Sequence, residues 1–279
     1  MPGAPGPLTL GSVDQRYVIE ESVQRRMVAN RDASTFLPFL LPHLRPGMDL
    51  LDAGCGVGSI ALDLAANFAP HRVVGVDFDG GQVEAAQRSC AERHLDNAEF
   101  FTASVYALPF DDASFDVVYS NAVLMYLREP VRALREMRRV LRPDGLAAVS
   151  DDDHGTIVIS PECPELTLFW SLADGVIAHE GGNARSSRHI RSLMLEAGFA
   201  RTRGVAQTPE VYGDVESTSW ATGLMADHLG IPTFREAIVG QGWATPAELD
   251  AAIVAIREWG KRPDALMAWL YCGALGWPR

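Results

Sequence analysis

The sequence predicts an α/β fold with a doubly wound, mostly parallel sheet. Between residues 48 and 151, short apolar runs alternate with segments that have helical spacing. Runs such as VVGV at 73–76 are apolar throughout, which is typical of strands covered on both faces. Gly54, Gly56 and Gly58 stand between the first of these strands and the first helix. We expect them to supply the positive φ angles of a loop that lets a ligand approach the backbone.

Capping and breaking residues set the boundaries of the predicted core elements. Pro130 fits the first turn of a helix, while Pro143 and Gly145 end that helix. In chain order we expect helices at 14–30 and 33–44, a strand at 48–53, a helix at 58–68, a strand at 72–77, a helix at 80–93, strands at 98–103 and 115–120, a helix at 130–141 and a strand at 145–151.

The second half of the chain adds apolar helical segments to this rhythm. We expect helical cap insertions at 161–185 and 214–262, and a capping box of Thr245, Pro246 and Glu248 begins the best-defined helix. A helix at 186–199, a strand over 201–212 and a final strand over 265–277 complete the predicted fold. Residues 1–279 then form a single domain, with a tail and helices at 1–45 and a core at 46–160.

Composition and charge exclude several classes of function. The formal net charge of −12 opposes a nucleic-acid partner, because such binding begins with a basic surface. No apolar run approaches the roughly 20 residues that span a bilayer, and the Pro/Gly-rich N-terminus does not resemble a signal peptide. Four scattered cysteines predict neither a disulfide nor a metal site. We therefore expect a cytoplasmic protein.

The spacing of the glycines and one acidic residue indicate the kind of ligand. The spacing is GxGxG, which differs from the GxGxxG of nicotinamide and flavin binders. Asp77 ends the run VVGVD, where a carboxylate can accept hydrogen bonds from both hydroxyls of a ribose. A ribose-bearing ligand follows from this pair of features.

The segments LDAGCGVG, VVGVD, LPFDDASFDVVYSNAVLMYL and LRPDG together resemble the class I S-adenosylmethionine-dependent methyltransferases. The resemblance covers about residues 45–151 and is strongest to the ubiquinone-biosynthesis-like small-molecule group, methyltransferase type 11. It implies that S-adenosyl-L-methionine is the cofactor and that the helices at 1–45 form a lid. The cofactor residues that it implies are Asp52, Gly54, Cys55 and Gly56 around the amino-acid portion, Asp77 at the ribose, Phe78, Ser104 and Val105 near adenine, and Asn121 near the methionine portion.

We expect methyl transfer to oxygen, nitrogen or carbon of a small, apolar or aromatic metabolite, in secondary metabolism. Nucleic-acid methyltransferases carry a different motif at SNAV, so a small substrate is favoured. Trp170, Trp220 and Met225 either line an apolar pocket or belong to the core. A homodimer is compatible with the sequence. Two alternatives stay open: a nicotinamide-dependent oxidoreductase, and a binding module that keeps the fold without catalysis.

The predicted catalytic residues are His154, Asp151 and Tyr17. His154 and Asp151 belong to DDDH at the end of the fifth core strand, where open α/β folds place their ligands. His154 is expected to accept a proton near neutral pH, although DDDH is also explained as an acidic turn. Tyr17 either reaches the site from the lid or is a core aromatic residue. No metal is expected, because three adjacent carboxylates on one loop cannot all point at one ion.

Overall fold

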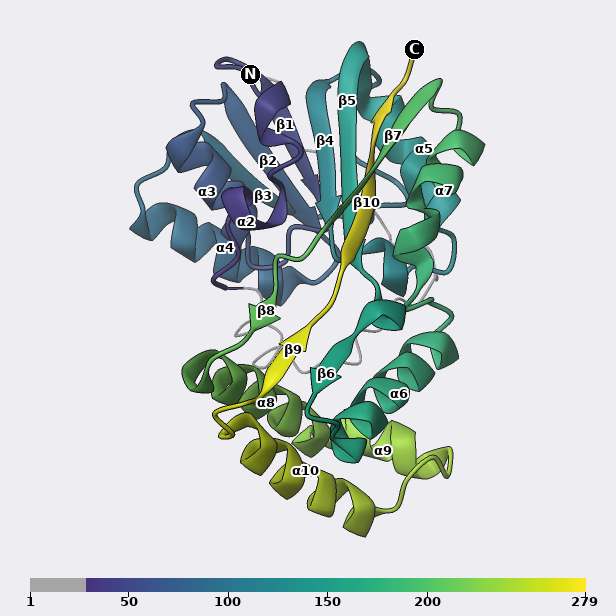
Figure 1. Cartoon of the computed structure of the whole chain (residues 1–279). Helices are drawn as coiled ribbons and strands as arrows, with labels where there is room; N and C mark the ends of the chain where they lie inside the picture. The colour runs from purple at the N-terminus through teal and green to yellow at the C-terminus, as the bar shows by residue number, and fades with distance from the viewer. Residues whose placement is uncertain (1–28) are drawn as a thin grey trace.

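The computed structural model describes residues 29–279, so the predicted helix at 14–30 lies almost wholly outside it. The main sheet has seven strands: β1 (Asp49–Ala53), β2 (Arg72–Asp77), β3 (Ala98–Thr102), β4 (Phe115–Asn121), β5 (Leu141–Asp152), β7 (Arg201–Gln207) and β10 (Tyr271–Trp277). Their order is β3-β2-β1-β4-β5-β10-β7 (Figure 1). Strands β1 to β5 are parallel, and β10 is antiparallel to both of its neighbours. The predicted α/β fold with a mostly parallel sheet is confirmed.

Helices cover both faces of this sheet. On one face α3 (Ser59–Asn67) and α4 (Gly80–Glu92) pack on β2 and β3, and on the other α5 (Pro130–Val140) and α7 (Ile190–Glu196) pack on β5, β7 and β10 (Figure 1). Leu50 and Leu51 are neighbours in β1 but belong to two different apolar cores, one on each face. This arrangement explains why the strands read as continuous apolar runs.

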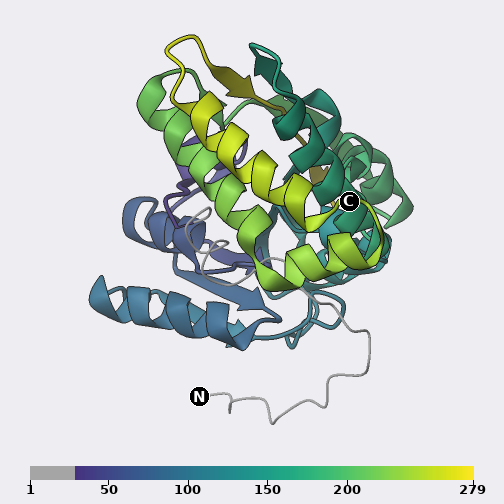
Figure 2. The ribbon, with the colours of Figure 1, turned by 90° about the horizontal axis from the view of Figure 1, so that it is seen from below.

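A second group of elements lies beyond the carboxyl ends of the parallel strands (Figure 1). It contains α6 (Pro164–His179), α8 (Val215–Gly230), α9 (Pro232–Gly240), α10 (Pro246–Gly260) and a small antiparallel sheet of β6 (Val158–Ser160), β9 (Leu266–Ala268) and β8 (Val211–Tyr212). We call these elements the cap. Seen from below in Figure 2, the cap helices lie in front of the main sheet. The predicted capping box at Thr245 and Glu248 is present at the start of α10.

Three predicted elements differ from the structure. The expected helix at 33–44 is only a turn of helix, α2 (Ala33–Phe36), followed by a 3₁₀ turn at Leu41–His43. Pro38 and Pro42 prevent a continuous helix, because proline lacks the amide hydrogen that helix bonding requires. The expected strands at 201–212 and 265–277 each break in two, so that one part joins the main sheet and the other the cap sheet.

Within residues 29–279, no helix has both the length and the apolar character needed to cross a membrane.

Candidate active site

The loop between β1 and α3 holds three glycines in the left-handed region. The φ angle is +92° at Gly54, +53° at Gly56 and +76° at Gly58, as the sequence predicts. A Cβ atom at Gly54 would collide with the side chain of Val123, so a larger residue would force that side chain to move. The Gly54 amide donates to the carbonyl of Val76 at 2.8 Å, which fixes the loop to the end of β2. The loop therefore presents bare backbone at the carboxyl end of the sheet.

Two buried carboxyl groups accompany this loop. Asp77, the last residue of β2, accepts the N–H groups of Gly56 at 2.9 Å and of Asp79 at 3.0 Å. Burial raises the pKa of its carboxyl group. Burial also raises the pKa of Asp52 to about 8, and the negative charge of Asp77 adds to this effect. Buried acceptors of this kind suit a ligand that carries hydroxyl groups and an ammonium group.

A cavity of about 200 Å³ extends from the glycine loop to the cap. Every predicted cofactor residue lines it except Ser104. The hydroxyl of Ser104 instead accepts the amide of Tyr106 at 3.2 Å and stabilises a turn, while its neighbour Val105 faces the cavity. The third predicted catalytic residue, Tyr17, lies outside the described residues. The structure therefore brings most of the predicted cofactor set together.

The three aspartates of DDDH point in different directions. Asp151 is buried away from the cavity and accepts two backbone N–H groups, at 2.8 and 2.9 Å, from the segment after β4. Asp153 binds the guanidinium of Arg188 through both of its oxygens, at 2.6 and 2.7 Å. Only Asp152 lines the cavity, together with His154. Among residues 29–279, no group of three or more His, Cys, Asp or Glu residues could hold a metal ion.

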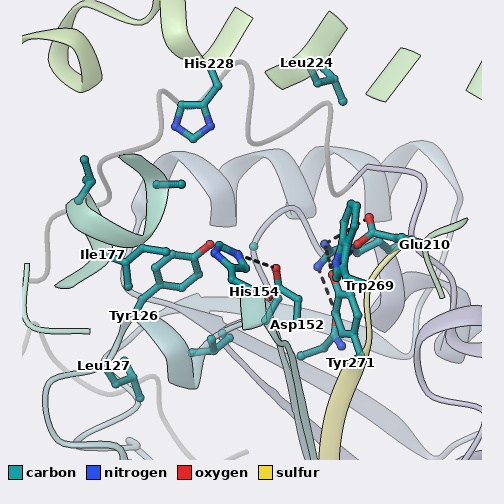
Figure 3. A pocket seen from close by; sticks show the side chains of 18 of the residues that line it. Tyr126, Leu127, Asp152, His154, Ile177, Glu210, Leu224, His228, Trp269 and Tyr271 are labelled. Atoms are coloured by element: carbon teal, nitrogen blue, oxygen red, sulfur yellow. Dashed lines mark hydrogen bonds and ion pairs between the residues drawn. The ribbon is translucent and has the colours of Figure 1, made fainter. Parts of the chain in front are cut away.

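His154 lies between two carboxylates, one of which Figure 3 shows beside it. Its Nδ1 is 2.5 Å from Oδ1 of Asp174, and its Nε2 is 3.2 Å from Oδ2 of Asp152. Burial by itself lowers the pKa of His154, but the hydrogen bonds and charges of these carboxylates raise it to about 9. His154 is therefore an imidazolium at neutral pH. With a proton on both ring nitrogens the ring can donate a proton but not accept one, and the catalytic role of His154 stays a prediction.

A second polar cluster joins the predicted Asn121 to residues that the sequence did not single out. Arg31 donates to the hydroxyl of Tyr271 at 2.9 Å and to Oδ1 of Asn121 at 3.3 Å. The Tyr271 hydroxyl in turn donates to Oε2 of Glu210 at 2.8 Å. Together with Asp152, these residues form the polar side of the cavity at the ends of β4, β5 and β10, which we call the floor (Figure 3). Arg31, Glu210 and Tyr271 come from distant parts of the chain, so no local motif could have revealed them.

A continuous row of rings connects the floor with the cap. The ring centroids of His154 and Trp170 are 4.7 Å apart, and Trp170 lies 5.2 Å from both Trp269 and Phe169. Phe169 is 5.8 Å from His228 of α8. All five residues line the cavity, and we call His154, Trp170, Trp269 and Phe169 the aromatic wall. Trp220 and Met225 also line it, while Met225 at the same time belongs to the apolar core on this face, so the two predicted alternatives do not exclude each other.

Comparisons with known proteins agree with this geometry. Residues 51–149 match the methyltransferase domain family. An uncharacterized 37.1 kDa protein from a Streptomyces fradiae transposon is 31% identical over 77% of this chain and 62% of its own length. A demethylmenaquinone methyltransferase from Lactococcus lactis is 34% identical over 43% of this chain and 48% of its own length. The YcgJ protein from Bacillus subtilis has a similar fold, with a TM-score of 0.59 and 18% identity over 87% of this chain and 98% of that one.

The matched family range contains the part of the chain that carries the cofactor motifs. It begins within β1 and ends within β5, whereas the cap helices lie outside it. The chain spans less than two thirds of the length of the two relatives just described. The sequence motifs, the strand order, the left-handed glycine loop and these similarities agree with one another. Residues 51–149 therefore form a methyltransferase domain, with the fold and motifs of the class I S-adenosylmethionine-dependent type.

Proposed function

We propose that the protein transfers the methyl group of S-adenosylmethionine to a small aromatic metabolite. The observation that supports this most strongly is the extent of the cavity. One space is lined by the glycine loop and Asp77 at one end and by the aromatic wall at the other. A methyl donor and its acceptor bound in this space would meet away from bulk water, where positioning alone can supply much of the rate enhancement.

The residues at the glycine loop fit the cofactor. Substituting Gly54 would place a Cβ atom against Val123, so the backbone stays open to a close ligand. Each oxygen of Asp77 accepts one amide and can accept a further hydrogen bond from a ribose hydroxyl. Phe78 offers its ring to adenine, and the ammonium group of the cofactor would favour the carboxylate form of Asp52 beside it. The bound cofactor supplies a methyl group that its sulfonium has already activated.

The floor and the wall would hold the acceptor molecule. Burial raises the pKa of Asp152, but the hydrogen bond and charge of His154 and the charge of Arg31 lower it overall, so the group is a carboxylate at neutral pH. It can accept a hydrogen bond from a hydroxyl or amine of the acceptor. The aromatic wall provides flat surfaces for stacking. The Lactococcus relative is named as a methyltransferase of demethylmenaquinone. That name supports a small molecule as the acceptor here.

Two ligands, S-adenosylhomocysteine and NADH, test the proposal by isothermal titration calorimetry and thermal unfolding. We expect S-adenosylhomocysteine to bind the purified protein and raise its melting temperature, because a ligand that binds only the folded state stabilises it. We expect no binding of NADH, because the glycine spacing does not match that of nicotinamide binders. Binding of NADH without binding of S-adenosylhomocysteine would instead support the oxidoreductase alternative.

A further inference from the structure

The side of the cavity opposite the floor is mostly apolar. Leu224 and Met225 of α8 and Phe234 of α9 line this side, which we call the roof. His228 is a polar exception, and its ring extends from α8 toward the cavity (Figure 3). The residue is 5% exposed, and its ring lies between the rings of Phe169 and Phe234, at centroid distances of 5.8 and 4.2 Å.

The His228 ring has an unpaired polar atom. Its Nε2 is buried and has no hydrogen-bond partner within residues 29–279. Burial lowers the pKa of His228 to about 4, so at neutral pH the ring is uncharged and carries one donor and one acceptor nitrogen. A buried polar atom without a partner destabilises the folded protein. A ligand that supplies the missing partner would explain why a histidine occupies this apolar roof.

Other residues around the same cavity show the same feature. Arg31, Trp170 and Trp269 each have a buried side-chain N–H without a partner in the described part of the chain. All three line the cavity, as His228 does. Unpaired polar atoms therefore occur on the floor, along the aromatic wall and on the roof. Their distribution indicates a ligand that presents polar groups at more than one end.

We propose that His228 forms a distal polar subsite, which recognises a hydroxyl or carbonyl oxygen of the substrate at the end opposite its reacting group. The substrate is then an aromatic molecule that stacks on the wall, with one polar group at the floor and another at the roof. This inference rests on the proposed function, because it assumes that the cavity holds the methyl acceptor. A purely apolar molecule of the same size would leave His228 unpaired and would bind more weakly.

Two naphthalene probes test this subsite by calorimetry on protein saturated with S-adenosylhomocysteine. One probe is a naphthol with a single hydroxyl, and the other is a naphthalene diol with hydroxyls at opposite ends. We expect the wild type to bind the diol about five- to tenfold more tightly, as one additional neutral hydrogen bond allows. His228→Phe should lose this preference, His228→Gln should keep it, and the exposed-site control His189→Phe should keep it.

The melting temperature of the variants distinguishes recognition from a structural role. His228→Phe should be at least as stable as the wild type, because it removes an unpaired buried atom. A large fall in its melting temperature would overturn the proposal, as would an equal preference for the diol in the wild type and in His228→Phe. No preference in the wild type would also overturn it. Failure of the wild type to bind S-adenosylhomocysteine would instead reject the proposed function itself.

Discussion

Replacing Asp77 with alanine is expected to lower the affinity for S-adenosylhomocysteine at least about 100-fold, since two hydrogen bonds to a charged group are lost. Asp77 is proposed to accept the ribose hydroxyls. It also accepts the Gly56 amide at 2.9 Å, which holds the glycine loop in place. Removing the carboxylate therefore weakens both the direct contacts and the shape of the loop.

Calorimetric titration of the wild type and of two variants measures this effect. Asp144→Ala is the matched control, because Asp144 is an exposed aspartate at the start of β5 and does not line the cavity. We expect its affinity to equal that of the wild type. An affinity of Asp77→Ala within about threefold of the wild type would show that Asp77 does not hold the cofactor.

The free energy of unfolding is expected to fall by about 3 kcal/mol as the pH rises from 6.5 to 9, through the titration of His154. The pKa of His154 in the folded protein is about 9, above its ordinary value of 6.5. The imidazolium between Asp152 and Asp174 therefore stabilises the fold fully below pH 6.5. This contribution disappears as the folded-state imidazolium loses its proton.

Urea denaturation at several pH values, with wild type and His154→Gln, measures this contribution. Asp52 and Asp151 also have pKa values raised by burial, to about 8 and about 7, so their contributions fall as the pH rises to these values and overlap that of His154 in the wild type. These two groups remain in the variant, so the difference between the two proteins isolates His154. We expect the curves to converge toward pH 9. Parallel curves would mean that His154 is not charged in the folded protein.

Local sequence patterns were sufficient to predict the core of the fold and the residues that line the glycine-loop end of the cavity. The glycine loop follows β1, and Asp77 is the last residue of β2. Because neighbouring parallel strands end at the same edge of the sheet, the sequence order already places the loop and Asp77 close together. The break of the predicted helix at 33–44 is also encoded locally, by Pro38 and Pro42. These features depend on backbone geometry, which a single sequence reveals directly.

The acceptor end of the cavity could not be predicted in the same way. The charge of His154 depends on Asp174, which is 20 residues away in α6. Arg31 and Tyr271 meet although 240 positions separate them. Nothing in the sequence around His228 indicates that its ring would be buried at the roof. Such contacts arise from the packing of the cap on the sheet, for which the chain carries no short motif.

The central claim is that the protein methylates a small aromatic molecule within the shared cavity. Its most direct test is mass spectrometry of a metabolite extract from the source cells after incubation with the protein and S-adenosylmethionine that carries an isotopically labelled methyl group. We predict a labelled aromatic product with the wild type and none with Asp77→Ala. Binding of S-adenosylhomocysteine without any labelled product would contradict the claim and would favour a binding module that has kept the fold.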